Sequence, residues 1–143
     1  MLDRFINAQE RTYEVALAEI KNGQKKTHWM WYIFPQLRGL GFSQMAYTYG
    51  IVDLNEAKEY LAHPILSERL IKITKALLDL NENDPEVILG DIDALKLKSS
   101  MTLFSLASEE GSVFYKTLEK FFGGSLDRET LKLLDISTRG NKK

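Results

Sequence analysis

The sequence contains no cysteine, only three prolines and only two histidines among its 143 residues. Without cysteine the chain can form no disulfide, no thiol nucleophile and no zinc site built on thiolates. Two histidines without the spacing of a metal motif make a weak metal site, so we expect neither a metal nor another cofactor. Basic and acidic residues nearly balance, 19 against 20, for a net charge of -1. This balance lacks the basic excess expected of a protein that binds a nucleic-acid strand.

The sequence also lacks the apolar N-terminal core of a signal peptide, because Asp3, Arg4 and Glu10 interrupt it. We therefore expect a cytoplasmic protein. Hydrophobic residues make up 44% of the chain and charged residues 27%, which is typical of a globular domain and excludes intrinsic disorder. The prediction is one domain over residues 1–136, followed by a frayed basic tail over residues 137–143.

Charge itself is scarce in one long segment. Between Thr27 and Val52 the only charged side chain is Arg38. The segment is long enough to cross a bilayer, but the proline, glycine, serine and glutamine residues at its centre would be costly in lipid. We therefore expect a buried segment and no membrane association. A second charge-free run covers residues 99–108, and we expect the two runs to pack on each other.

Apolar residues recur at helical spacing, and no alternating strand pattern is convincing. The fold prediction is therefore all-α, a single compact domain of about seven to nine short helices. The first predicted helix covers residues 2–22, and Thr27 is predicted to cap a short second helix. A clean apolar stripe runs along residues 66–80. Polar caps and prolines predict further helix starts at Ser43, Asp53, Pro64, Asp84, Asp91 or Asp93, Ser112 and Asp127.

The first candidate site is the segment from Arg38 to Ser43, which reads RGLGFS. Gly39 and Gly41 let a backbone approach a ligand closely, and the helix start at Ser43 offers N–H groups to an anion. Arg38 can grip a phosphate or carboxylate through two hydrogen bonds. A tight turn explains the same glycines. No predicted strand precedes them, so a dinucleotide-binding fingerprint is excluded.

The second candidate site surrounds Lys96, which on a helix lies beside Asp93, Ser99 and Ser100. A lysine at the edge of a charge-free run can bind an anionic ligand. The alternative is a surface ion pair with Asp93, worth less than about 1 kcal/mol. Because Arg38 and Lys96 mark the edges of the two charge-poor runs, we hypothesise that they belong to one anion site.

The two histidines have different surroundings. His28 adjoins Trp29 in the charge-poor segment, and because an imidazole titrates near neutrality it is the candidate for acid–base chemistry. A hydrogen-bonded structural histidine is the alternative. His63 precedes Pro64 and is predicted to be a helix cap or a packing residue. The aromatic residues of the segment are core residues first, but they can also form the walls around a planar ring such as a nucleobase.

The strings HWMWYIFPQLRGLGFS and KLKSSMTLF resemble a bacterial family of domains of unknown function whose members are often labelled calpastatin. The resemblance extends over nearly the whole chain, from RFINAQ to FFGGSLDRETL. It implies a stand-alone helical domain with no established reaction, whereas the composition excludes the disordered inhibitor that the label names. The family signature falls on His28, Trp29, Phe34, Pro35, Gln36, Gly39, Gly41, Ser43, Tyr49, His63, Pro64, Arg69, Lys96, Ser99, Ser100 and Thr102.

Two functions from different classes are consistent with these patterns. In the first, a small anionic ligand, nucleotide or ADP-ribose-like, binds a pocket lined by residues 27–52 and 96–104, with hydrolysis as the reaction class and His28 as its acid–base group. In the second, a protein-interaction module presents the stripe of residues 66–80 or an exposed aromatic patch, and the polar residues form a structural network. A concave site favours the first and a large exposed apolar patch the second. The expected ligand contacts are Trp29, Gln36, Arg38, Gly39, Gly41, Ser43, Tyr49, Lys96, Ser99 and Ser100.

Overall fold

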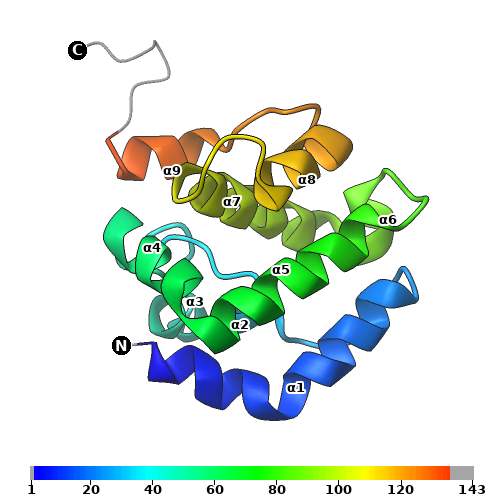
Figure 1. Ribbon diagram of the computed structural model, residues 1–143, viewed down its shortest axis with the longest axis horizontal. Helices are drawn as coiled ribbons and strands as arrows, with labels where there is room; N and C mark the ends of the chain where they lie inside the picture. Colours follow the sequence, from blue (N-terminus) through cyan, green and yellow to red (C-terminus); the bar gives the residue numbers. More distant parts are fainter. Residues whose placement is uncertain (1, 136–143) are drawn as a thin grey trace.

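The computed structural model describes residues 2–135, which are helical apart from turns and one isolated backbone bridge (Figure 1). This confirms the predicted all-α single domain, while the predicted tail at residues 137–143 lies outside the described residues. None of the described helices is long and apolar enough to cross a membrane. The helices of residues 2–135 are α1 (Asp3–Lys21), α2 (Met30–Ile33), α3 (Gln44–Thr48), α4 (Leu54–Ala62), α5 (Pro64–Leu78), α6 (Pro85–Leu89), α7 (Asp91–Leu106), α8 (Val113–Phe122) and α9 (Arg128–Leu133).

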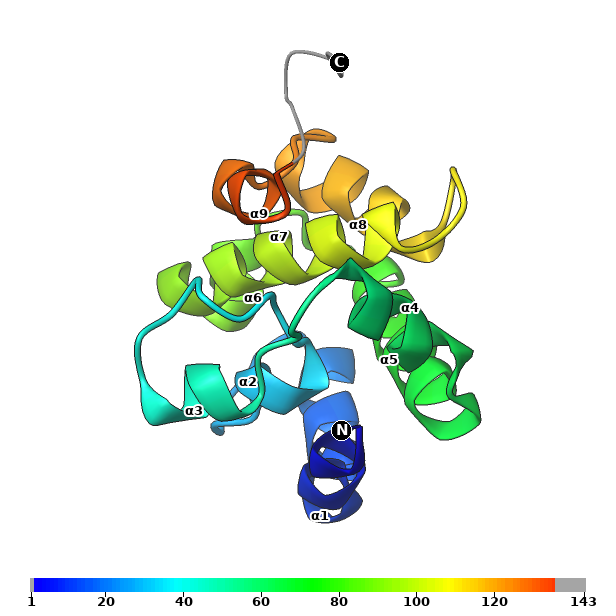
Figure 2. The same ribbon diagram turned by 90° about the vertical axis from the view of Figure 1, so that its left-hand side faces the viewer.

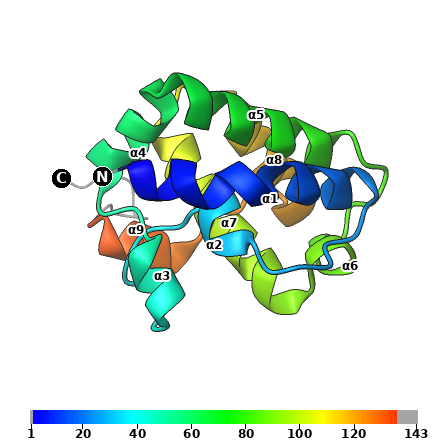
Figure 3. The same cartoon turned by 90° about the horizontal axis from the view of Figure 1, so that it is seen from below.

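The long helices α1, α5 and α7 organise the domain. α5 packs on α1 and on α8, and α7 packs against α8, α6, α4 and α9. With α7 drawn across the middle of the view, α8 and α9 lie above it and α1 and α3 below it (Figure 2). The short helix α2 packs on α1 and lies between α3 and the first turns of α7 when the molecule is seen from below (Figure 3).

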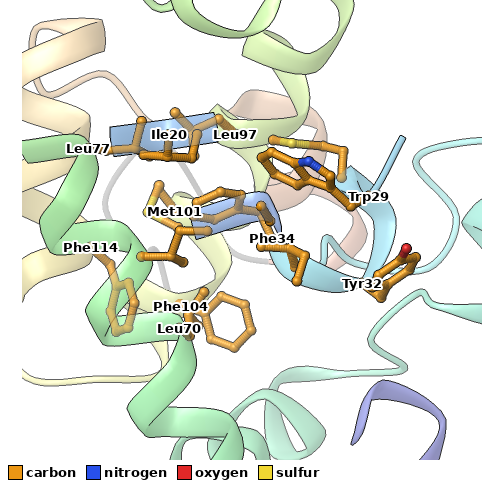
Figure 4. Close-up of a cluster of buried hydrophobic side chains, with 14 of the residues drawn as sticks. Ile20, Trp29, Tyr32, Phe34, Leu70, Leu77, Leu97, Met101, Phe104 and Phe114 are labelled. Carbon is orange, nitrogen blue, oxygen red and sulfur yellow. The ribbon is translucent and has the colours of Figure 1, made fainter. Parts of the chain in front are cut away.

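An aromatic core joins these helices. The ring of Tyr60 in α4 lies 5.2 Å from that of Phe5 in α1 and 5.2 Å from that of Phe104 in α7. The two charge-poor runs meet in the same buried cluster, to which Trp29 contributes from one run and Phe104 from the other (Figure 4). The expectation that these runs pack together is therefore confirmed.

The apolar stripe of α5 is part of this core. Leu66, Leu70, Ile73 and Leu77 are each at most 1% exposed, because α1 and α8 cover the helix. The hypothesis that the stripe of residues 66–80 faces a partner is therefore wrong.

Most helix starts follow the predicted caps. The side chains of Ser43, Asp53 and Asp127 each accept a hydrogen bond from the backbone N–H three residues later. His63 Nδ1 accepts from the first N–H groups of α5, which confirms its prediction as a cap. Thr27 is the exception: α2 begins only at Met30, without a side-chain cap. The hydroxyl of Thr27 donates instead to Glu19, at 2.7 Å.

The chain between α2 and α4 forms a closed excursion of residues 38–50, which we name the 38–50 loop. At its base Leu37 and Ile51 form a parallel bridge. The Arg38 N–H donates to the carbonyl of Ile51 at 2.8 Å, and the Ile51 N–H donates to that of Gln36 at 2.9 Å. Gly50 lies against this base. A β-carbon on Gly50 would be 2.6 Å from the Arg38 Cα, so only glycine fits.

Candidate functional site

Two cavities adjoin each other between α2, α3 and the first turns of α7 (Figure 3). They share the lining residues Met30, Trp31 and Lys96. The larger, which we name the wide pocket, has a volume of about 270 Å³ and is also lined by Lys25, His28, Leu89, Gly90, Asp91, Ile92 and Asp93. The smaller, the narrow slot, has a volume of about 10 Å³, enough for about one water molecule, and is also lined by Phe34, Gln36, Met45, Ala46, Tyr49 and Gly50.

Positive charge in the wide pocket comes from two lysines that share one carboxylate. Lys25 Nζ lies 2.9 Å from one oxygen of Asp93, and Lys96 Nζ lies 3.4 Å from the other. The predicted pair of Asp93 and Lys96 is thus confirmed, but the shorter contact is with Lys25. The carboxylate of Asp91, also in the lining, accepts the N–H of Ile92 at 2.8 Å. The two lysines are therefore the groups of the lining that attract an anion.

Both lysines also lie against an indole ring. Lys25 Nζ is 5.1 Å from the ring centroid of Trp29, and Lys96 Nζ is 4.7 Å from that of Trp31. At these distances the quadrupole of the ring attracts the ammonium group. Both ammonium groups are thus held in place from two sides, by a carboxylate and by an aromatic face.

The turn before α2 is fixed by Glu19. Its carboxylate accepts hydrogen bonds from the N–H groups of Lys26 and Thr27, from the Thr27 hydroxyl and from the Trp29 indole N–H, at 2.7–3.1 Å. Burial raises the pKa of Glu19, but these hydrogen bonds outweigh burial and lower the pKa to about 2. Trp29, predicted as a ligand contact, donates its indole N–H to Glu19 and is 1% exposed, so its role is structural.

Polar groups without a partner lie at the narrow slot. Gln36 and Tyr49 line it, and neither the Gln36 amide nor the Tyr49 hydroxyl makes a hydrogen bond with any residue in the described part of the chain. The Tyr49 ring packs on Tyr32 at 5.2 Å, which directs the attention to its free hydroxyl. The Ser100 Oγ is also buried without a partner, but Ser100 lines neither cavity.

Other residues predicted to contact a ligand have structural roles. The Ser43 hydroxyl caps α3, and the Ser99 hydroxyl donates to the carbonyl of Leu95 at 3.1 Å. Arg38 donates through Nε to the carbonyl of Tyr47 at 2.9 Å, and its guanidinium lies 4.3 Å from the centroid of that ring. Arg38 lines neither cavity, so the structure does not bring it into the pocket of Lys96.

The two glycines of the RGLGFS segment shape the approach to the slot. Gly39 has φ of +107°, which favours glycine, and lies beside Leu133. A β-carbon on Gly41 would be 2.8 Å from that of Ala46 and 3.8 Å from the amide nitrogen of Gln36. Close packing against the wall of the slot, rather than contact with an anion, accounts for Gly41.

The sequence analysis missed a set of polar contacts that join distant segments. Arg4 donates to the carbonyls of Thr48 and Gly50, both at 2.8 Å, and pairs with Glu56 at 3.0 Å. These contacts fix the end of the 38–50 loop against α1. Burial raises the pKa of Glu56, but hydrogen bonds from Arg4 and the Val52 N–H lower it overall. No local pattern reveals this pair, because 52 positions separate Arg4 from Glu56.

A second missed cluster surrounds Gln9, which is 1% exposed. Its amide donates to the carbonyl of Tyr32 at 2.7 Å and to the Tyr60 hydroxyl at 3.0 Å, and its oxygen accepts from Arg69 at 3.3 Å. This cluster ties α1 to α2, α4 and α5. Arg69, a residue of the family signature, therefore has a structural role. Among residues 2–135 no three His, Asp or Glu side chains are grouped to hold a metal ion.

These features define a small helical domain with a lysine-lined pocket, and the comparisons with known proteins give its family. The chain belongs to the family described as protein of unknown function (DUF1810), whose model matches residues 1–134. Its structure is similar to the crystal structure of the conserved hypothetical protein Rv1873 from Mycobacterium tuberculosis. The identity is 44%, the TM-score is 0.91, and the match covers 95% of this chain and 97% of that one. Neither description carries the calpastatin label. No curated protein matches the chain.

Proposed function

We propose that the protein binds a small anionic ligand in the wide pocket. The observation that carries this proposal is the convergence of Lys25 and Lys96 on the single carboxylate of Asp93 in a pocket of about 270 Å³. An anion that enters can take hydrogen bonds from both ammonium groups while Asp93 keeps them in place. The first turn of α7 lines the same pocket, and the partial positive charge at a helix N-terminus adds to the attraction.

The pocket favours a ligand about the size of a nucleotide. Its volume lies near the lower end of the range of small-molecule sites, about 300–1,000 Å³. Trp31 contributes an aromatic wall that is shared with the narrow slot. The ligand class that we propose is a phosphorylated metabolite, nucleotide or ADP-ribose-like, with its phosphate at Lys25 and Lys96.

His28 is the residue that we propose for proton transfer, with hydrolysis as the reaction class. Its side chain is exposed, lines the wide pocket, and has no hydrogen bond to any described residue. An imidazole free of structural contacts can exchange protons with a bound ligand at neutral pH. The His28→Gln variant separates this role from binding: we expect it to retain affinity for ADP-ribose within about twofold, while hydrolysis of ADP-ribose, followed by chromatography, is lost.

The test of binding is the Lys96→Met variant, which keeps the length of the side chain and removes its charge. Isothermal titration with inorganic phosphate, AMP and ADP-ribose is expected to show an affinity at least about tenfold lower than that of the wild type, because a charge-assisted hydrogen bond is lost. Lys98→Met is the matched control, since Lys98 lies on the same helix but lines neither cavity. Its affinity is expected to equal that of the wild type.

Two outcomes would contradict the proposal. If the wild type binds none of the three probes at millimolar concentration, the wide pocket is not an anion site, and the alternative of a protein-interaction module with a structural polar network gains support. If Lys96→Met and Lys98→Met weaken binding equally, the anion binds elsewhere on the surface. The wild type is also expected to melt at a higher temperature with a saturating probe, because a ligand that binds only the folded state stabilises it.

A further inference from the structure

We infer that the ligand carries a flat heterocycle and that Phe42 packs on this ring at the mouth of the narrow slot. This inference rests on the proposed function, because the anionic group of the same ligand lies in the wide pocket. It adds a residue, Phe42, that makes no contact with the cavities in the structure as it stands. The three observations that lead to it concern the exposure of Phe42, its position and the chemistry of the slot.

Phe42 is 99% exposed, more than the other exposed large apolar side chains of the described residues. Single exposed apolar residues are common on protein surfaces, but Phe42 belongs to a group. Met45 lines the slot and is 36% exposed, and Ile92 lines the wide pocket and is 67% exposed. Apolar groups gathered around a cavity are typical of a binding site, so the side chain of Phe42 has a use at this site.

The position of Phe42 is set by its neighbour in the chain. Gly41 packs against Ala46 and lies near the Gln36 amide, and both residues line the slot. Phe42 therefore leaves the 38–50 loop beside the wall of the slot. Gly39, two residues before Gly41, has φ of +107°. Glycines at these two positions give the loop more freedom than other residues would.

The chemistry of the slot fits the edge of a heterocycle. The Gln36 amide offers a donor and an acceptor side by side, and such a pair matches two adjacent groups on a base edge. The Tyr49 hydroxyl is a further donor or acceptor, and neither group has a partner among residues 2–135. Trp31 contributes an aromatic face. A ring that bonds Gln36 and Tyr49 places its anionic group beside Lys96, which lines both cavities.

The slot must open for this ring to enter, since its volume is about 10 Å³. The part of its wall that can move is the 38–50 loop, because Met30, Trp31 and Phe34 belong to the buried segment around α2. An outward shift of Met45 and Ala46 separates them from Trp31. It leaves the ring covered on one side by Trp31 and on the other by Phe42.

The experiment compares two probes, AMP and inorganic phosphate, which share an anionic group but differ in the ring. For the wild type we expect tighter binding of AMP than of phosphate in isothermal titration. For Phe42→Ala we expect an AMP affinity lower by about tenfold, because stacking on an aromatic side chain is lost, and an unchanged phosphate affinity. Phe42→Tyr, which keeps the ring, is expected to restore AMP binding. Val15→Ala removes an exposed apolar side chain from α1 and is expected to change neither affinity.

The possible failures are distinguishable. Wild-type protein that binds phosphate and AMP equally, or a Phe42→Ala variant with unaltered AMP affinity, would overturn this inference and leave the proposed function standing. Wild-type protein that binds neither probe would overturn both. Misfolding does not obscure the result, because Phe42 is fully exposed and Phe42→Ala is expected to melt at the wild-type temperature. A lower melting temperature would show that Phe42 packs on the protein, which also contradicts the inference.

Discussion

Replacement of Gly50 by alanine is expected to lower the free energy of unfolding by about 3 kcal/mol, the upper part of the range for overpacked sites. The new β-carbon would lie 2.6 Å from the Arg38 Cα and 2.9 Å from the carbonyl oxygen of Ala46. Both are backbone atoms or fixed to the backbone, so they cannot rotate away as the end of a flexible side chain can. The measurement is urea unfolding, followed by the circular dichroism of the helices.

The matched control is Gly23→Ala. Gly23 ends the first helix at φ of +78°, with no atom within 4 Å of an added β-carbon. Alanine there has an unfavourable backbone conformation but no clash, which costs about 1 kcal/mol. The difference between the two variants isolates the clash at Gly50. Equal losses in both variants would show that the base of the 38–50 loop yields, and that the close contact with Arg38 does not constrain the fold.

The second large effect is expected for Glu19→Ala, which should lower the free energy of unfolding by about 2–3 kcal/mol. The substitution leaves the buried indole N–H of Trp29 and two backbone N–H groups without their acceptor, and unsatisfied buried donors are costly. Glu19→Gln keeps one oxygen as an acceptor and is expected to lose about half as much. Wild-type stability in Glu19→Ala would indicate that water replaces the carboxylate fully.

The same residue has a pH signature. The pKa of Glu19 is about 2 in the folded protein and 4.5 as its unperturbed value. A carboxyl whose pKa is lower in the folded state stabilises the protein above pH 4.5, and this contribution is lost as the pH falls toward 2. Urea midpoints measured between pH 6 and pH 2 are therefore expected to fall more steeply for the wild type than for Glu19→Gln. Parallel slopes would show that the hydrogen bonds of Glu19 do not distinguish its charged form.

The helical fold could be predicted from the sequence because its signals are local. Ser43, Asp53 and Asp127 cap helices through N–H groups three residues away, and His63 does so within its own turn. Thr27 was mispredicted because the same hydroxyl has a stronger acceptor in the charged carboxylate of Glu19, eight positions away. A cap is a local choice that a tertiary contact can override.

The candidate site was predicted only in part. Lys96, Gln36 and Tyr49 do line one slot, because the charge-poor runs that contain or flank them pack together. Lys25 was missed, since its partner Asp93 is on another helix and no local spacing joins the two. The polar residues of the family signature also include structural ones, such as Arg69 on Gln9. Residue type alone does not separate the two roles, because both need a polar group in a buried place.

The bridge between Leu37 and Ile51 has a consequence for how this family can diversify. Because the two ends of the 38–50 loop are paired with each other, the entropy of closing the loop grows only slowly with its length. Insertions or deletions inside the loop therefore leave the helical scaffold and its lysine pair intact. Under this arrangement, relatives can acquire different ligands by exchanging one short segment, much as antibodies change specificity through loops on a constant framework.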